Sequence, residues 1–201
     1  MQIEVVYGGS AKLLIPEVSQ QLFNFSSAHK YYSRETIRFW YDYHDVTPDV
    51  FKVAPPSHAI VRYEKRTAGM GNVISSRFTK NQPRVYWQGS GRNYYTLALI
   101  DPDAPSRKDP TFGQFRHWLV INIPEKHVRK GQVISKYIAP APPEKTRWHR
   151  YVFSIFKQNG RIKSLEENED NRPKWNISEF ASRNGLKLVA GTYFASRNPK
   201  Q

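Results

Sequence analysis

Three short apolar segments, each bounded by proline or turn residues, constrain the fold of this chain more than any other feature. They cover residues 94–100, 118–123 and 148–156. Segments that are this short and almost continuously apolar are typical of strands buried on both faces of a sheet. Alternating residues at 59–63 and 84–87 and a short apolar segment at 188–194 predict further strands. We therefore expect a β-rich domain with few helices.

Two helices are predicted at the edges of this pattern. Residues 33–36 can start the first helix, which the residue before Pro48 ends, because that residue is pushed out of the helical region. Asn176 and Glu179 form a capping box for the second helix, and Asn184-Gly185 supplies its left-handed stop. The organisation that we predict has a partly helical N-terminal arm (1–45), a domain (46–196) and a polar tail (197–201).

Charge is distributed unevenly over these parts. The chain has 201 residues and a net charge of +14, and residues 1–45 hold four basic and five acidic side chains, so residues 46–201 carry a net charge of +15. Such a surplus favours an anionic partner. Cysteine is absent, which excludes disulfides, thiol nucleophiles and cysteine-ligated zinc. No apolar segment approaches the roughly 18 residues of a membrane-spanning helix.

Four polar side chains that could form a binding site fall at or near the ends of the predicted strands. Asp101 ends the first apolar segment, and His117 opens the second. If these strands pair antiparallel, the end of one lies beside the start of the other. His149 opens the third segment, with Tyr151 on the same face two residues later. Imidazole and phenol groups can donate hydrogen bonds to phosphate or carboxylate oxygens, and a carboxylate behind an imidazole fixes the nitrogen that faces the ligand. The pattern predicts a small anion-binding pocket.

The motifs around these residues resemble those of the phosphatidylethanolamine-binding protein family, which includes Raf kinase inhibitor protein and the plant flowering-time regulators. They are the block Asp-Pro-Asp-Ala-Pro-Ser (101–106), a histidine eleven residues after Ser106, a Pro-Pro loop and His-Arg-Tyr (149–151). The resemblance covers about residues 47–195. It implies a mostly β, two-sheet fold with a few short peripheral helices and a shallow cavity for phosphate-bearing head groups.

The resemblance also implies a set of ligand-binding residues. These are Asp101, Pro105, Phe115, His117, Ala141, Pro142, Pro143, His149, Tyr151 and Phe194. Three of them depart from the family pattern, because the family often has tryptophan at the position of Phe115, glycine at that of Ala141 and tyrosine at that of Phe194. Arg116 stands where the family often has a second histidine. The C-terminal helix that normally follows the last strand has no counterpart here.

From these features we predict a non-enzymatic protein that binds a phosphate-bearing small ligand or phospholipid head group. The resemblance implies that it regulates or inhibits a protein partner such as a kinase or protease. We expect no cofactor or metal, and a monomer. The charge of +15 on the domain leaves an alternative, an RNA-contacting structural component of a ribonucleoprotein such as the mitochondrial ribosome, with an anionic surface or nucleic acid as partner.

An enzyme is the third class of protein to consider. Asp101, His117 and His149 are the residue types of a two-histidine, one-carboxylate metal site, and His149 could act as a general base beside Ser106 or Tyr151. No nucleophile elbow or paired carboxylate accompanies the histidines, so we expect no enzyme. The first residues show neither a signal-peptide core nor an acid-poor, arginine-rich leader, which predicts a cytoplasmic location, with a mitochondrial one as the alternative.

Overall fold

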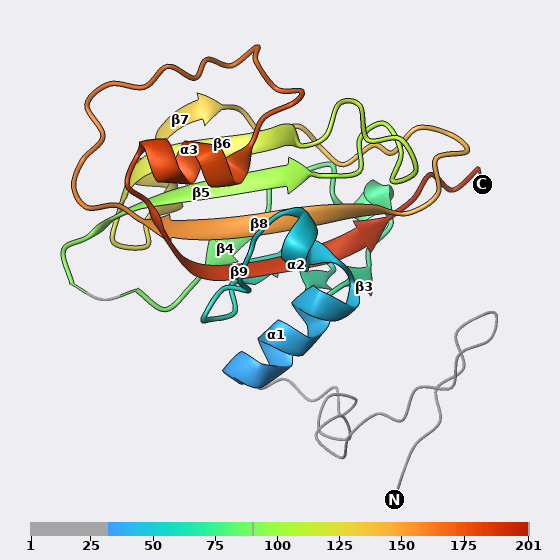
Figure 1. The fold of residues 1–201 in the computed structure, drawn as a ribbon, viewed down its shortest axis with the longest axis horizontal. Coiled ribbons are helices and arrows are strands. Elements are labelled where there is room, and N and C mark those ends of the chain that lie inside the picture. The colour runs from blue at the N-terminus through green and yellow to red at the C-terminus, as the bar shows by residue number, and fades with distance from the viewer. Residues whose placement is uncertain (1–31, 90, 201) are drawn as a thin grey trace, which may run out of the picture. The chain divides into compact units, whose positions relative to one another are not determined.

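The computed structural model describes residues 32–89 and 91–200. It is mostly β, with two sheets packed face to face and short helices on the outer side of the larger sheet (Figure 1). The mostly β, two-sheet fold predicted from the sequence is therefore confirmed. No helix in this part of the chain is long and apolar enough to cross a bilayer.

The larger sheet has six strands in the order β3-β9-β8-β5-β6-β7. Their bounds are β3 Asn72–Val73, β5 Tyr94–Asp101, β6 Phe115–Pro124, β7 Gln132–Ser135, β8 His149–Lys157 and β9 Lys187–Ser196. All neighbours pair antiparallel except β3 and β9, which are parallel. The three apolar segments of the sequence form β5, β6 and β8, which lie side by side in the sheet. They are apolar along almost their whole length because both faces of these strands are covered.

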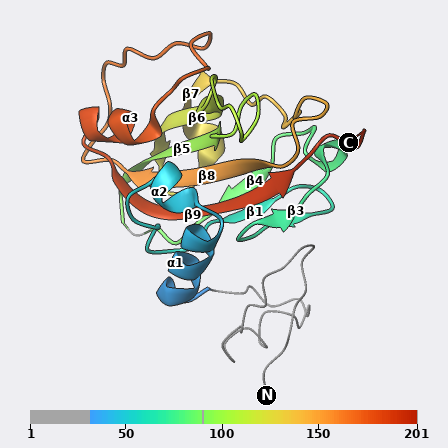
Figure 2. The same ribbon diagram turned by 45° about the vertical axis from the view of Figure 1, so that its right-hand side comes forward.

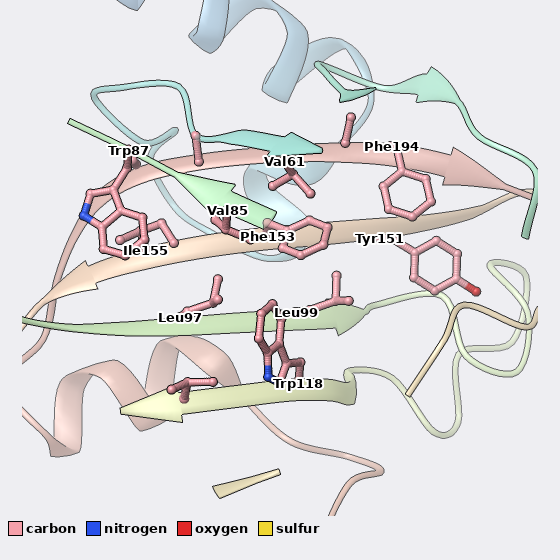
Figure 3. Packing of buried hydrophobic residues seen from close by; sticks show 14 of the residues in the cluster. Val61, Val85, Trp87, Leu97, Leu99, Trp118, Tyr151, Phe153, Ile155 and Phe194 are labelled. Atoms are coloured by element: carbon pink, nitrogen blue, oxygen red, sulfur yellow. The ribbon is translucent and has the colours of Figure 1, made fainter. Parts of the chain in front are cut away.

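The smaller sheet has three short strands in the order β2-β1-β4, of which β1 and β4 are labelled in Figure 2. These are β1 Ile60–Arg62, β2 Thr67–Ala68 and β4 Arg84–Tyr86. Their inward side chains pack on one face of the larger sheet, as the close view of Val61, Val85 and Phe153 shows (Figure 3). Val61 and Val85 are buried and alternate with exposed neighbours, so one face of the smaller sheet packs on the core and the other faces solvent.

Helices cover the opposite face of the larger sheet. They are α1 Arg34–Tyr43, α2 Val46–Asp49 and α3 Ile177–Arg183, and two single 3-10 turns lie elsewhere, at η2 Ser76–Phe78 and η3 Val128–Lys130. The Ser33 hydroxyl accepts the N–H of Thr36 and caps α1. The Asn176 side chain caps α3 as predicted, but the carboxylate of Glu179 lies 3.9 Å from Arg183 rather than completing a capping box.

Helix α1 packs with the domain. Ile37 and Tyr41 are fully buried in the same core cluster as Ile100 and Val152 of the central strands. Residues from 32 onward form one compact unit. The boundary placed after residue 45 stays a prediction, and most of the predicted arm lies outside the described residues. The tail is in contact with the domain, since the Arg197 guanidinium lies 4.7 Å from the centre of the Trp148 ring.

Candidate functional site

The four polar residues singled out in the sequence lie together at one end of the larger sheet. Asp101 is the last residue of β5, His117 is the third of β6, and His149 opens β8, beside β5 in the sheet. This arrangement follows from antiparallel pairing, which sets the end of β5 against the start of β6 and of β8. The structure therefore brings three strand ends to one place, although whether they bind a ligand stays a prediction.

Asp101 and His149 form the centre of the site. His149 Nδ1 donates to Asp101 Oδ2 over 2.8 Å, and both side chains are almost completely buried. The other carboxylate oxygen of Asp101 accepts the backbone N–H of Asp103 over 2.8 Å. Both oxygens of Asp101 are thus satisfied from within the chain, and the His149 ring is fixed with Nδ1 toward the carboxylate and Nε2 away from it.

Thr146 covers the second nitrogen of His149. Its hydroxyl oxygen lies 2.9 Å from His149 Nε2, and the hydroxyl donates to the carbonyl oxygen of Pro143 over 2.8 Å. His149 is therefore held at both ring nitrogens, by Asp101 at Nδ1 and by the Thr146 hydroxyl at Nε2.

His117 makes a different hydrogen bond, to a backbone carbonyl. Its Nδ1 donates to the carbonyl oxygen of Ile138 over 2.8 Å. Burial lowers the pKa of His117, and this effect outweighs the Ile138 carbonyl and the charge of Asp101, which act to raise it. The ring is therefore neutral near pH 7, with Nε2 as a hydrogen-bond acceptor. His117 is 6% exposed, more than Asp101, His149 or Tyr151.

Aromatic rings form the floor of the site. Tyr151 lies beside Phe194 of β9, with ring centres 5.2 Å apart and planes at 22° (Figure 3). The edge of the His117 ring meets Tyr151 at 5.3 Å, and Phe115 meets His117 at 5.0 Å. Burial, followed by the charge of Asp101, raises the pKa of Tyr151 well above its ordinary value, so the phenol remains a neutral donor.

The predicted wall residues lie in two loops around this cluster. Pro105 is half-buried in the loop that follows Asp103. Pro142 is buried, whereas Ala141 and Pro143 are exposed. The carbonyl of Pro143 is tied to the centre of the site through Thr146, and that of Pro142 accepts a hydrogen bond from Asn198 of the tail over 3.1 Å.

Sequence reasoning missed Thr146 and the role of Arg150. The Arg150 guanidinium makes two hydrogen bonds to Asp103, at 3.0 and 2.6 Å, and lies 2.9 Å from Asp49. Burial alone lowers the pKa of Arg150, but its bonds to Asp103 and Asp49 and their charges raise it overall. The sequence does contain a signal for the pair of Arg150 and Asp103. Arg150 follows His149 directly, and Asp103 is the second aspartate of the Asp-Pro-Asp block.

The metal-site alternative finds no support in the geometry. Among residues 32–89 and 91–200, no three histidine, aspartate or glutamate side chains are arranged to hold a metal ion. Asp101 and His149 contact each other directly, while His117 Nδ1 is occupied by the Ile138 carbonyl.

Acidification is expected to destabilise the fold through buried histidines. Burial lowers the pKa of His58 to about 4 and also lowers those of His44 and His117. The unfolded chain then binds protons more readily than the folded one, so stability is full above about pH 6.5 and falls as the pH drops toward 4. His58 alone should contribute about 2–3 kcal/mol of this loss. Urea unfolding at pH 7 and pH 4.5 measures it.

A matched pair of variants tests whether His58 causes this loss of stability at low pH. His58→Gln should flatten the pH dependence, whereas His127→Gln should leave it unchanged, because the His127 side chain is 59% exposed. An equal stability of the natural chain at the two pH values would contradict this prediction.

Comparison with known proteins agrees with this architecture. Residues 64–194 match the family model described as phosphatidylethanolamine-binding protein. Among curated proteins, "Putative odorant-binding protein A5" of Drosophila melanogaster is 30% identical over 160 residues, which cover 76% of each chain. The "26 kDa secreted antigen" of Toxocara canis is 31% identical over 159 residues, which cover 76% of this chain and 61% of that protein.

Solved structures show the same fold. Carboxypeptidase Y inhibitor, in a crystal structure with its cognate proteinase, has a TM-score of 0.74 at 23% identity and covers 89% of this chain and 99% of its own. The phosphatidylethanolamine-binding protein of Plasmodium vivax has a TM-score of 0.70 at 22% identity, with 80% and 96% covered. The chain is thus a two-sheet β protein with Asp101, His117 and His149 together at one end of the larger sheet. The chain belongs to the phosphatidylethanolamine-binding protein family.

Proposed function

We propose that the protein binds a phosphate-bearing head group at the cluster of Asp101, His117, His149 and Tyr151. The observation that carries this proposal is the 2.8 Å bond between Asp101 and His149, which fixes the ring with Nε2 directed away from the carboxylate. The Thr146 hydroxyl lies at that nitrogen. For a proton on Nε2, a phosphate oxygen is a stronger acceptor than a hydroxyl because it is charged, so it can replace Thr146 there.

The two histidines suit different atoms of such a ligand. His149 offers a donor, which fits an ionised phosphate oxygen. His117 is neutral and offers an acceptor at Nε2, which fits a protonated phosphate oxygen or an ammonium group. Tyr151 adds a neutral hydroxyl next to Asp101. A zwitterionic head group such as phosphoethanolamine supplies both kinds of partner. His117, as the most exposed of the four, marks the side from which a ligand enters.

The proposed role for the complex is regulation of a protein partner, without catalysis. Carboxypeptidase Y inhibitor, which shares the fold, is a protease inhibitor crystallised with its target, and this supports a protease as the kind of partner to test first. The described residues pair Asp101 with a histidine and not with a nucleophile, which fits a binding role. The predicted kinase partner, cytoplasmic location and monomeric state remain predictions.

Calorimetric titration with phosphoethanolamine, inorganic phosphate and ethanolamine tests the binding proposal. The natural chain should bind phosphoethanolamine and phosphate but not ethanolamine alone. His149→Gln should weaken binding about tenfold or more, because a charge-assisted hydrogen bond is lost. His127→Gln removes an exposed histidine and should leave affinity unchanged. Equal affinity of the two variants would contradict the assignment.

A further inference from the structure

The outer face of the smaller sheet carries side chains that the proposed site does not use. Val61 and Val85 point toward the larger sheet (Figure 3), so their neighbours Arg62, Arg84 and Tyr86 point to solvent. All three are exposed, and Tyr86 keeps 47% of its surface accessible. This face lies on the opposite side of the molecule's core from the helices that cover the larger sheet.

Two arginines oppose each other on this face. Arg62 and Arg84 are direct partners in the antiparallel pairing of β1 and β4. Like charges in that position destabilise a sheet. Within residues 32–89 and 91–200, no carboxylate lies at ion-pair distance from either guanidinium. An anion bound between the strands would remove the repulsion.

A second arginine pair lies off this face. Arg66, in the turn between β1 and β2, and Arg77 both lie against the ring of Phe78, which packs on the core between the sheets, at 4.5 and 4.6 Å from its centre. Residues 60–86 hold six basic side chains and a single acidic one, Glu64. The carboxylate of Glu64 accepts a hydrogen bond from Asn81 over 3.2 Å and does not pair with an arginine.

We propose that this basic face, defined by Arg62, Arg84 and Tyr86, binds single-stranded nucleic acid. Arginines along a groove or sheet face contact phosphates, and an exposed aromatic ring between them stacks on a base. Tyr86 pairs across the sheet with Ile60, so an apolar surface lies beside the arginines. The assignment rests on these side chains and is independent of the proposed head-group site.

The composition of the face favours nucleic acid over a membrane. Peripheral membrane binding needs several large apolar side chains that enter the lipid. Tyr86 is the sole exposed large apolar residue among those of β1, β2 and β4. One ring beside two facing arginines suits stacking and phosphate contacts.

Fluorescence anisotropy with a labelled, mixed-sequence 12-nucleotide RNA tests this proposal on the full chain. With two phosphate contacts from the face, the logarithm of the binding constant should fall against that of salt concentration with a slope of about −1.4. Arg62→Gln/Arg84→Gln should remove most of this slope and weaken binding about tenfold or more at low salt. Tyr86→Ala should weaken binding about tenfold, and Tyr86→Phe should restore it, because the ring does the stacking.

A matched control separates a defined face from general charge. Arg161→Gln/Lys163→Gln removes two exposed charges next to Ile162, which packs on the helix-covered face. This variant should retain RNA affinity within about twofold, since non-contacting charges act weakly at moderate salt. Equal weakening by both double variants, or an unchanged affinity of Tyr86→Ala, would overturn the proposal. Binding to phosphatidylserine vesicles but not to RNA would also overturn it.

Two further readouts keep the result interpretable. The Gln variants remove a like-charge contact from exposed positions, so their melting temperatures should be no lower than that of the natural chain. His149→Gln should bind RNA normally. Loss of head-group binding with retained RNA binding in His149→Gln is therefore the result that both proposals predict. If the natural chain binds the head group but not RNA, the basic face is rejected and the head-group site still stands.

Discussion

Arg150→Met is expected to lower the free energy of unfolding by about 3–5 kcal/mol, because it leaves a buried carboxylate without its counter-charge. Asp103 is 1% exposed, and both of its oxygens accept hydrogen bonds from Arg150. Methionine keeps most of the apolar stem of arginine, so the loss reports on the charge and its hydrogen bonds. Chemical denaturation monitored by tryptophan fluorescence measures the difference.

The same substitution should also loosen the segment that precedes β1. Arg150 Nη1 donates to the carbonyl oxygens of His44 and Asp45, at 3.0 and 2.6 Å. These bonds join the end of α1 to the strand that carries His149. Faster amide exchange in α1 than in β9 is therefore expected in the variant.

Arg38→Met provides the matched control. Arg38 also pairs with an aspartate, Asp42, at 3.6 Å, but the two side chains are 80% and 49% exposed. Exposed pairs of this kind contribute about 0–1 kcal/mol. A loss in Arg150→Met as small as that in Arg38→Met would contradict the structural role of the buried pair.

Asp101→Asn is expected to weaken head-group binding about 10–100-fold while the chain stays folded. Asparagine has the same size, but one of its oxygens is replaced by an amide group, which donates. Asp101 accepts from both His149 Nδ1 and the N–H of Asp103, so a donor would meet a donor at one of these contacts. His149 then loses the partner that fixes its orientation.

Asp109→Asn controls for the loss of one negative charge in the same loop. Asp109 is exposed, and its backbone rather than its carboxylate makes the hydrogen bonds to Ser106. Calorimetric titration with phosphoethanolamine should give the natural affinity for this variant. If Asp101→Asn also binds with the natural affinity, the acid is a structural residue and the binding proposal fails at its centre.

The order of strands at the site was predictable from the sequence. The buried segments ending at Asp101 and opening at His117 and His149 needed only antiparallel pairing to meet, and β5 indeed pairs with both β6 and β8. The capping of α3 by Asn176 and its stop at Gly185, with a φ of 59°, also followed from local residue types. Such features depend on neighbours in the sequence or on one simple pairing rule.

Long-range contacts were harder to predict. The bonds from Arg150 to the carbonyls of His44 and Asp45 join residues more than 100 positions apart, and a sequence pattern gives no register for them. The parallel pairing of β3 with β9 involves only two residues, 72 and 73, in a segment without strand-like alternation. Thr146 acts through a single hydroxyl, which no periodicity marks.

Histidine side-chain NMR tests the central claim most directly. In long-range ¹H–¹⁵N spectra recorded during titration with phosphoethanolamine, the ring nitrogens of His117 and His149 should shift together and saturate at one ligand per chain. The exposed His127 should not respond. His149 should carry two ring protons in the complex, with Nδ1–H donating to Asp101 and Nε2–H donating to the phosphate. Unchanged resonances of His117 and His149 at saturating phosphoethanolamine would contradict the account.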